Sequence, residues 1–390
     1  MNLVSVPVAY MPLVDAAPLI AAHEMGFAQA EGVSLDLIAA PSWSSVRDML
    51  AFGRVDAAHL LSPVPIAMAL GLGGVSTAVS AVSVLSVNGN VIGVGQDIEA
   101  RLRAGGFAFD FTNAHAAGAE LAEVIPDGMT VGVPFPFSLH AELLKYWIAG
   151  TPLASKKIDI RTVPPPLMAR ALAEGEIDAF CVGEPWGSVA VEQGTGSLLL
   201  PCSAIWASSP EKVLAVRTDW AETEPDLLGR LMRAVWRAGK WLALPESRPA
   251  AAALLSRSEY LDVSSELIDR ALTGHITIST AGETRQVPHF LEFHHGAANF
   301  PWRSQAKWIG SRLAQTYGLE LATAQSTAAS VFRSDLFRDV LGGLGADMPG
   351  ASEKIEGSLV HPTAIASADG HTILPPDQFF DGKIFDPIRN

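Results

Sequence analysis

The hydrophobic pattern of this chain repeats one short unit at two distant positions. The first copy covers residues 53–63 and the second covers residues 175–185, and both place a glycine, an aliphatic residue, Asp-Ala and a closing proline in the same register. Each copy follows an amphipathic run with helical spacing. The unit therefore predicts a helix with a glycine C-cap, then a short buried strand and a turn at the proline. Two such units indicate two lobes.

Aliphatic runs and alternating positions predict further strands around both copies. Leu3 to Tyr10 and Val33 to Ala39 precede the first copy, with a helix after each strand, which gives the βαβαβ unit of a parallel sheet. After Asn88 the same order returns, with predicted strands at Met129–Val133 and Ile158–Val163. The second lobe therefore retraces the first, and both lobes are of the α/β class.

A strand predicted at Val213–Val216 returns the chain toward the first lobe. We predict that the first lobe comprises residues 1–88 and 206–390 and that the second lobe comprises residues 89–205. A chain that starts and ends in the same lobe is typical of hinged proteins that close on a small ligand in the cleft between their lobes. The helices expected after the return strand are Glu224–Ala243, Ala250–Ser256, Ser264–Ala271, Ala306–Tyr317 and Ser326–Val340.

One stretch, from Leu60 to Gln96, contains no charged residue and is long enough to cross a bilayer. Prolines and glycines interrupt it, and positions 75–87 alternate with the period of a strand. We therefore predict a short helix, a glycine turn and a buried strand here, and no membrane span.

Composition narrows the class of protein. The 390 residues are too many for one core and suit two domains of ordinary size. Hydrophobic residues make up 49% and charged residues 17% of the chain, which excludes a disordered protein. The net charge of -14 excludes a nucleic-acid surface, because phosphate binding needs a basic face. It also repels anions at long range, so an anionic ligand would need a local cluster of donors.

The sequence lacks the common catalytic motifs, such as a nucleophile elbow, a Walker loop, a zinc-protease helix or a dinucleotide fingerprint. Cys181 and Cys202 have no redox or metal spacing, and we interpret Cys181 as a buried filler. Glu292, His294 and His295 suggest a metal site, but adjacent histidines point in different directions, whereas metal ligands converge. We therefore predict a protein that is not an enzyme and that has no metal or cofactor.

Five residues lie next to the ends of predicted strands, where α/β sheets bind their ligands. They offer an indole N–H, an amide, an imidazole, a backbone N–H and an ammonium group, all of which can donate hydrogen bonds. Such a set suits a small planar oxyanion, with the ammonium group balancing its charge. The residues are Trp43, Asn90, His140, Gly183 and Lys212.

Each of these residues also has a purely structural interpretation. Trp43 could be a packed aromatic residue, His140 a capping or core histidine and Lys212 a solvated charge. Asn90 could be a turn residue, and Gly183 could form a tight bend. The acids at positions 178 and 184 would repel an anion, so we expect them to cap helices or to connect the lobes.

Seven motifs resemble, in the same order over essentially the whole chain, the nitrate- and bicarbonate-binding proteins of the NrtA/CmpA type. Any one motif would be weak, but the shared order is specific. The resemblance implies a two-lobed periplasmic-binding-protein-like (type II) fold with nitrate in the cleft. The motifs are Leu13–Ile20, Ser42–Asp48, Asp56–Pro63, Val87–Gly89, Phe180–Trp186, Pro210–Lys212 and Phe379–Pro387.

By position, the resemblance implies that Trp43, His140, Gly183 and Lys212 contact nitrate. Lys212 also matches the nitrate branch of the family, since the bicarbonate branch has an acid there and recruits calcium. Asn90 departs from the longer Gln of the nitrate transporters' binding proteins. This departure implies a smaller pocket, a bridging water or a shift toward nitrite.

The N-terminal segment Met1–Val8 has no basic region or cleavage site and is not a secretory signal. A transport receptor is exported, so the chain resembles most the cytoplasmic NasS-type nitrate/nitrite sensors. That resemblance implies a cytoplasmic protein, without contacts of its own to nucleic acid or membrane, that regulates nitrate assimilation. It would hold a NasT-like ANTAR-domain RNA-binding antiterminator until nitrate or nitrite closes the cleft.

Two alternative functions stay open. The first is the substrate-binding subunit of a nitrate ABC importer, which neighbouring permease and ATPase genes would favour, whereas a neighbouring gene for an RNA-binding regulator would favour sensing. The second is an enzyme of pyrimidine-precursor synthesis, which shares the fold. That enzyme needs a reactive histidine and cofactor-binding residues that the sequence does not place, and fold alone does not give function.

Overall fold

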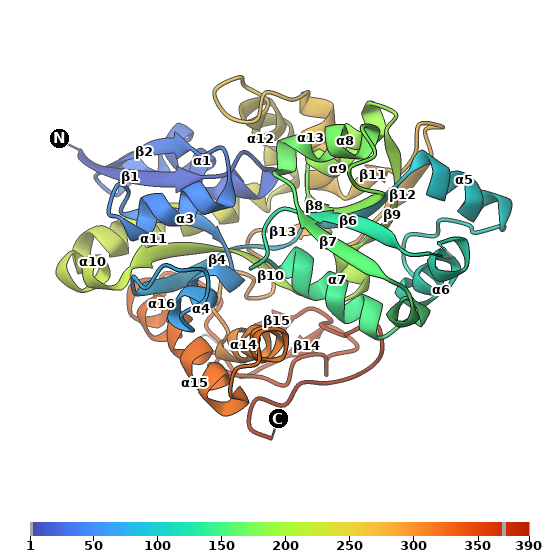
Figure 1. Cartoon of the computed structure of the whole chain (residues 1–390). Coiled ribbons are helices and arrows are strands. Elements are labelled where there is room, and N and C mark those ends of the chain that lie inside the picture. The colour runs from blue at the N-terminus through green and yellow to red at the C-terminus, as the bar shows by residue number, and fades with distance from the viewer. Residues whose placement is uncertain (1–2, 126, 369–371, 390) are drawn as a thin grey trace.

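The computed structural model describes residues 3–125, 127–368 and 372–389. Its main strands form a mixed six-stranded sheet and a five-stranded sheet, which lie side by side with helices packed around them (Figure 1). In sheet order the first contains β13 (Leu291–Glu292), β4 (Val79–Asn88), β10 (Pro210–Arg217), β3 (Ala57–Leu61), β1 (Val4–Tyr10) and β2 (Val33–Ala39), and the second contains β7 (Ile158–Thr162), β6 (Met129–Val133), β8 (Ala179–Gly183), β5 (Asn90–Gly95) and β9 (Gly196–Pro201).

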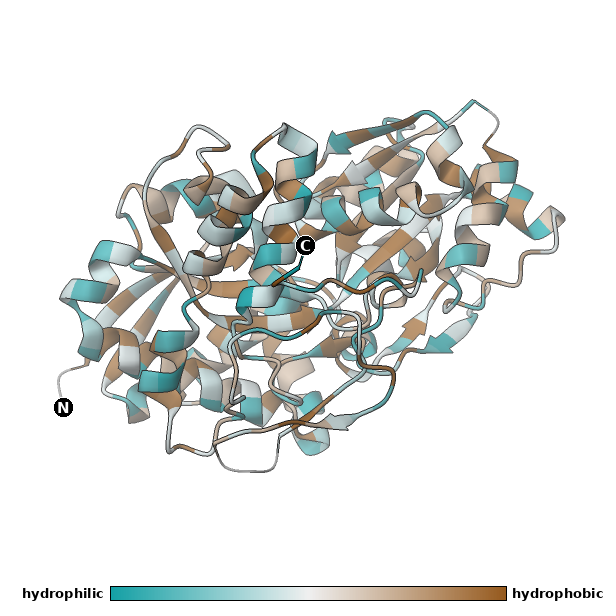
Figure 2. Cartoon of the chain, turned by 90° about the horizontal axis from the view of Figure 1, so that it is seen from below, coloured by the Kyte–Doolittle hydropathy of each residue, from teal (hydrophilic) through white to brown (hydrophobic). Residues whose placement is uncertain are grey.

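Helices cover the sheets, so that hydrophobic strands lie inside and hydrophilic residues face outward (Figure 2). These helices are α1 (Ala17–Glu24), α2 (Phe27–Ala30), α3 (Trp43–Ala51), α4 (Pro63–Ala69), α5 (Gln96–Ala104), α6 (Ala114–Val124), α7 (Leu139–Ala149), α8 (Met168–Ala173), α9 (Trp186–Glu192), α10 (Thr218–Thr223), α11 (Pro225–Leu242), α12 (Arg248–Leu255), α13 (Ser265–Thr273), α14 (Arg303–Tyr317), α15 (Leu321–Val331) and α16 (Ser334–Leu341). Most of the helices predicted for the second half of the chain are confirmed, with ends shifted by a few residues.

The repeated unit forms as predicted in both halves of the molecule. Helices α3 and α8 each lead to a glycine with a positive φ, 71° at Gly53 and 70° at Gly175. Strands β3 and β8 follow, and both are buried at every position. The backbone N–H of the aspartate in each unit donates to the neighbouring parallel strand, at 2.9 Å for Asp56 and 2.8 Å for Asp178. The two units therefore hold equivalent places in the two sheets.

The return strand β10 is confirmed, and it makes the first sheet mixed. It runs antiparallel between β3 and β4, whereas β1 pairs in parallel with β2 and β3. The stretch from Leu60 to Gln96 forms the predicted helix α4 and the buried strand β4, followed by β5. Within the described ranges, no helix combines the length and the apolar character that crossing a bilayer requires.

The single helix predicted over Ser326–Val340 is wrong. Helix α15 ends at Val331 because Phe332 is extended, with a ψ of 103°, and its backbone forms a β-bridge with Ala81 of β4. Helix α16 then starts anew at Ser334. The helical pattern is continuous in the sequence, but the buried Phe332 side chain and its contact with the first sheet decide the break.

Parts of the chain assigned to the first lobe also contact the second sheet. The hairpin of β11 (His275–Thr277) and β12 (Thr284–Gln286) lies beside β9, where the backbone N–H of Leu198 donates to Ile278 at 2.8 Å. Near the C-terminus, Tyr146 Oη on α7 donates to Asp381 at 2.9 Å. The lobe boundaries therefore stay a prediction, and the later chain bridges both sheets.

Two segments connect the sheets, and we call residues 88–90 and 202–209 the crossing segments. The side chain of Asn88 joins them, because its Nδ2 donates to the carbonyl of Ala207 at 2.9 Å and its Oδ1 accepts from the backbone N–H of Ser209 at 3.0 Å. Asn88 itself has a φ of 63°, which asparagine tolerates better than most residues. The C-terminal segment Phe379–Pro387 lies beside the second crossing segment, with Phe379 stacked on Trp206.

Candidate functional site

Lys212 is the centre of a buried charged cluster between the two sheets. Its side chain is fully buried, and its Nζ lies 2.7 Å from Asp15 Oδ2 and 3.0 Å from Glu211 Oε1. The sequence predicts that Lys212 balances the charge of an anion, but in the structure its ammonium group is already paired with two acids. We call Asp15, Glu211 and Lys212 the site triad.

A β-bulge brings Glu211 and Lys212 together, although neighbours in a regular strand point to opposite faces. Between Pro210 and Lys212, β10 advances by two residues while β4 advances by one, from Val87 to Ser86. Glu211 is therefore the extra residue of the bulge, and bulges re-aim side chains in this way. The result is that both charged groups of β10 lie in the same buried place.

Trp43 and His140 approach the site triad from helices that pack on different sheets, α3 on the first sheet and α7 on the second. Each residue lies in the first turn of its helix, which a serine caps. The ring centroid of Trp43 lies 5.5 Å from Lys212 Nζ, and His140 Nδ1 lies 3.2 Å from Glu211 Oε1. Helix N-termini favour nearby negative charge, because their N–H groups point outward. The structure thus brings both predicted residues to Lys212, in the first turns of helices α3 and α7.

Asn90 and Gly183 lie opposite each other in the adjacent strands β5 and β8. A Cβ atom on Gly183 would lie only 2.7 Å from Leu13 Cδ2 and 3.3 Å from Asn90 Oδ1. Glycine is required here because the first lobe packs directly against this strand. Gly183 lies inside β8 and not in a bend after it, and its role as a backbone donor to an anion stays a prediction.

Sequence reasoning missed three side chains of the cluster: Asp15, His59 and Glu211. His59 on β3 is fully buried, and its Nε2 lies 3.0 Å from Asp15 Oδ1. All three residues lie within motifs that carry the family resemblance, so a signal was present. The sequence argument against acids concerned positions 178 and 184, and only the structure shows that Asp15 and Glu211 lie beside the lysine.

Several buried polar atoms of the cluster have no hydrogen-bond partner among the described residues. They include Trp43 Nε1, both polar side-chain atoms of Asn90, both ring nitrogens of His140 and Glu211 Oε2. The Asn90 side chain nevertheless lies close enough to Glu211 to lower the pKa of that acid. The approach of His140 to Glu211 is short enough for an ion pair but lacks hydrogen-bond geometry. Because buried polar groups are nearly always paired, such a concentration points to a place for a ligand with acceptor atoms.

Burial and mutual charges set the protonation states of the cluster. Burial alone would raise the pKa of Asp15, but Lys212 and His59 outweigh it and hold that pKa well below its usual range. Burial raises the pKa of Glu211 even though Lys212 opposes the shift. Burial lowers the pKa of His59 and, most strongly, of His140, where Lys212 adds to the effect. The cluster therefore holds one cation, one firmly ionised acid and one acid that protonates more readily.

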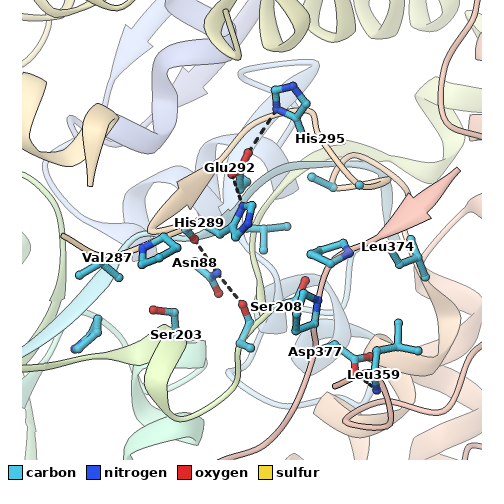
Figure 3. Close-up of a pocket in the computed structure, with 18 of the residues that line it drawn as sticks. Asn88, Ser203, Ser208, Val287, His289, Glu292, His295, Leu359, Leu374 and Asp377 are labelled. Carbon is cyan, nitrogen blue, oxygen red and sulfur yellow. Dashed lines mark hydrogen bonds and ion pairs between the residues drawn. The ribbon is translucent and has the colours of Figure 1, made fainter. Parts of the chain in front are cut away.

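A cavity of about 220 Å³ lies beside the crossing segments (Figure 3). Lys212 is not one of the residues that line it. Asn88, Ser203 and Ser208 line it together with later parts of the chain. At its rim, Glu292 lies 2.8 Å from His289 Nδ1 and 3.6 Å from His295 Nδ1. In the part of the chain that the structure describes, no group of three His, Cys, Asp or Glu side chains could hold a metal ion.

Comparison with known sequences gives a family and two informative relatives. The profile of the NMT1-like family matches residues 1–256. The nitrate/nitrite binding protein NrtA of Nostoc sp. is 27% identical over 97% of this chain and 82% of its own length. The nitrate import ATP-binding protein NrtC of Synechocystis sp. is 32% identical over 80% of this chain. The chain spans only 46% of the length of NrtC, which carries more sequence than this chain.

Solved structures give the same fold. The periplasmic nitrate-binding protein NrtA from Synechocystis matches with a TM-score of 0.84 and 26% identity, over 99% of this chain and 96% of that chain. The alkanesulfonate-binding protein SsuA from Xanthomonas axonopodis matches with a TM-score of 0.57 and 14% identity, which shows the fold alone. The predicted two-lobed periplasmic-binding-protein-like α/β fold and the resemblance to the NrtA/CmpA type are therefore confirmed.

Proposed function

This chain belongs to the NMT1-like family, and we propose that it binds nitrate or nitrite in the cluster around Lys212. The observation that carries the proposal is the set of buried donors from both sheets, at Trp43, Asn90 and His140, that lack partners among the described residues. Nitrate and nitrite are small planar anions that carry only acceptor atoms, which matches such a set. The similarity to NrtA proteins over nearly the whole chain supports the same ligand class.

Charge limits which anions the cluster can hold. Asp15 and Glu211 already place two carboxyl groups beside one buried ammonium group. A divalent anion such as sulfate would add twice the negative charge of nitrate in a medium of low dielectric constant, where unbalanced charge is costly. We therefore expect singly charged oxyanions to bind and sulfate to be rejected.

Calorimetric titration with nitrate, nitrite, bicarbonate and sulfate tests the proposal. We expect heat of binding with one or both nitrogen oxyanions, and none with sulfate. Lys212→Glu removes the only cation of the site triad and should weaken binding by more than about 100-fold. Lys157→Glu makes the same charge change at a side chain that is 78% exposed, and it should leave the affinity unchanged. If neither nitrate nor nitrite binds the wild-type protein, the proposal is wrong.

We extend this proposal to a sensor that regulates nitrate assimilation from the cytoplasm. The cluster joins groups of both sheets, so an anion within it stabilises the closed arrangement of the lobes. A NasT-like ANTAR-domain regulator that prefers another arrangement would then be released by nitrate or nitrite. A pull-down of the purified regulator should lose it on addition of nitrate, whereas Lys212→Glu should retain it. Retention that nitrate does not change would contradict the sensor.

The second candidate is the substrate-binding subunit of a nitrate ABC importer. It is favoured by the similarity to NrtC, whose name states nitrate import, and to the periplasmic NrtA. An importer subunit should stimulate the ATPase activity of its permease complex when nitrate is bound, and a sensor should not. That measurement separates the two candidates even if both bind nitrate equally.

A further inference from the structure

The site triad contains two carboxyl groups but only one ammonium group, and this imbalance determines how an anion can enter. We propose that Glu211 takes up one proton from solution when the anion binds, so that its carboxyl group becomes a hydrogen-bond donor to the anion. The inference rests on the proposed function, because it concerns the same site. It makes Glu211 a ligand-contacting residue, although sequence reasoning did not select it.

Glu211 has the geometry for this role. Its Oε1 accepts a hydrogen bond from Lys212 Nζ at 3.0 Å, and His140 Nδ1 lies 3.2 Å from the same oxygen without hydrogen-bond geometry. Its Oε2 is buried and has no hydrogen-bond partner in the described ranges. When the group is ionised, Oε2 is a bare acceptor that repels an anion. When the group is protonated, an O–H at Oε2 can donate to the anion.

The charges that face Glu211 come from several elements of both sheets. With both acids ionised, the cluster carries one positive and two negative charges, and an anion would add a third negative charge in a fully buried place. Uptake of one proton leaves the number of negative charges unchanged on binding. The titratable groups concerned are Lys212 on β10, Asp15 in residues 14–16, His59 on β3, His140 on α7 and the thiols of Cys181 on β8 and Cys202 after β9.

The other groups are less suited to accept the proton. Burial raises the pKa of Asp15, but Lys212 and His59 both contact its carboxyl group and lower that pKa further than burial raises it. Burial and the neighbouring Lys212 lower the pKa of His140, so that its ring is neutral. The Cys181 thiol is already protonated, because burial raises its pKa. Glu211 is the acid of the site triad whose pKa is raised overall, because burial outweighs the opposing effects of Lys212 and Asn90, and its Oε2 accepts no hydrogen bond from the described residues.

Anion affinity must then depend on pH. Below the pKa of Glu211 in the free protein the proton is already present, so affinity is constant. Above that pKa the proton comes from solution, and affinity falls about tenfold for each pH unit. Glu211→Gln supplies a permanent neutral donor. The affinity of that variant should therefore not change with pH, and at alkaline pH it should exceed the wild-type affinity by about tenfold or more.

The decisive measurement is calorimetry of the full chain with nitrate and with nitrite, at several values between about pH 6 and pH 9, in paired buffers of different ionisation enthalpy. The difference between buffers gives the number of protons taken up. For the wild-type protein we expect uptake to rise toward one proton per anion as the pH increases. Because this measurement needs no variant, it stays valid even if Glu211→Gln does not fold.

Two variants assign the proton. Glu211→Gln should abolish the uptake while binding persists. Glu184→Gln is the matched control, because Glu184 is also a buried acid, with a pKa that burial raises to about 7, but its Oε2 caps helix α9 at Ser188. That control should keep the full uptake. Uptake that survives in Glu211→Gln, or that disappears in Glu184→Gln, would assign the proton elsewhere and overturn the inference.

The inference and the proposed function fail in different ways. Anion binding without proton uptake at any pH overturns the role of Glu211 and leaves the nitrate-binding function intact. If the wild-type protein gives no heat with nitrate or nitrite at either end of the pH range, and Glu211→Gln also gives none, the proposed function itself is wrong.

Discussion

Two lysines of this protein, the fully buried Lys212 and Lys354, whose side chain is 16% exposed, each lie between two carboxylates, and their surroundings differ. In the site triad, Lys212 is fully buried between its two acids. In a second cluster, which we call the C-terminal triad, Lys354 pairs with Glu356 and Asp377. Both clusters therefore have the same formal charges, and both contain acids that are almost completely buried.

The protein itself satisfies the acids of the C-terminal triad. Glu356 Oε1 accepts from Ser304 Oγ at 2.6 Å, and Asp377 Oδ1 accepts from the backbone N–H of Leu359 at 2.8 Å. Asp377 also lines the cavity shown in Figure 3. The site triad instead leaves Glu211 Oε2 and its neighbouring donors without partners among the described residues. A lysine between two buried acids is thus not a ligand site by itself, and unpaired donors around the acids make the difference.

The largest expected effect is on the free energy of unfolding, to which we expect Lys354 to contribute more than Lys212. Lys354→Met leaves Glu356 and Asp377 buried without their cation and should lower the free energy of unfolding by about 3–5 kcal/mol. Nitrate affinity, measured by calorimetry on the folded variant, should stay within about twofold of wild type, because distant sites behave independently. Urea denaturation gives the stability. A loss of nitrate affinity in this variant would contradict the structural role of the C-terminal triad.

The matched variant Lys212→Met should show the reverse behaviour. Nitrate binding should disappear, whereas the stability loss should be smaller than in Lys354→Met. The reason is that Glu211 can take up a proton and His59 still lies beside Asp15. Equal losses of stability in the two variants would remove the distinction between the triads.

An intermediate effect comes from Glu184, a buried acid that belongs to neither triad. Burial raises its pKa from the ordinary 4.5 to about 7, so it contributes stability that is fully present below pH 4.5 and is lost as the pH rises to about 7. A glutamine at position 184 does not titrate, so the free energy of unfolding of Glu184→Gln should fall by about 3 kcal/mol less than that of the wild-type protein over this pH range. Urea denaturation of both proteins between about pH 5 and pH 8 gives the comparison. Parallel pH profiles of stability would show that Glu184 does not titrate as stated.

The smallest expected effect compares two donors that lie beside the triads, Ser304 next to Glu356 and Trp43 next to Lys212. Ser304→Ala removes the hydroxyl that donates to Glu356 and should cost about 1–3 kcal/mol of stability with no effect on nitrate. Trp43→Phe removes an indole N–H that has no partner in the described part of the chain, so it should weaken nitrate binding by about tenfold and change stability less. Denaturation and calorimetry on both variants test the pair. A Trp43→Phe variant with unchanged nitrate affinity would exclude the indole as a ligand donor.

Much of the architecture could be predicted because it depends on local patterns. The glycines at positions 53 and 175 adopt positive φ after helices, and the buried strands that follow have continuous apolar sequences. The break at Phe332 could not be predicted, because it depends on a contact with Ala81, which is distant in the sequence. For the same reason the contact of the hairpin after α13 with the second sheet was not foreseen.

The candidate site was predicted only in part. Trp43, His140 and Lys212 were chosen as donors from their positions near strand ends, and the structure brings them together. Asp15 and Glu211 were missed, since their acidity argues against an anion site when each residue is considered alone. Only a count of the charges in one buried volume shows that the acids belong to the site.

The sequence by itself determined the two repeated units, the α/β class and a set of donor residues, because glycine conformations, hydrophobic periods and side-chain chemistry are local properties. The tertiary structure decided which charges meet. Sheet packing buries Asp15 against Lys212, and a bulge in β10 turns Glu211 to the same point. In this buried site of low dielectric constant, the protonation of each group depends on all the charged groups around it. Those groups come from distant parts of the chain, so no single stretch of sequence can specify them.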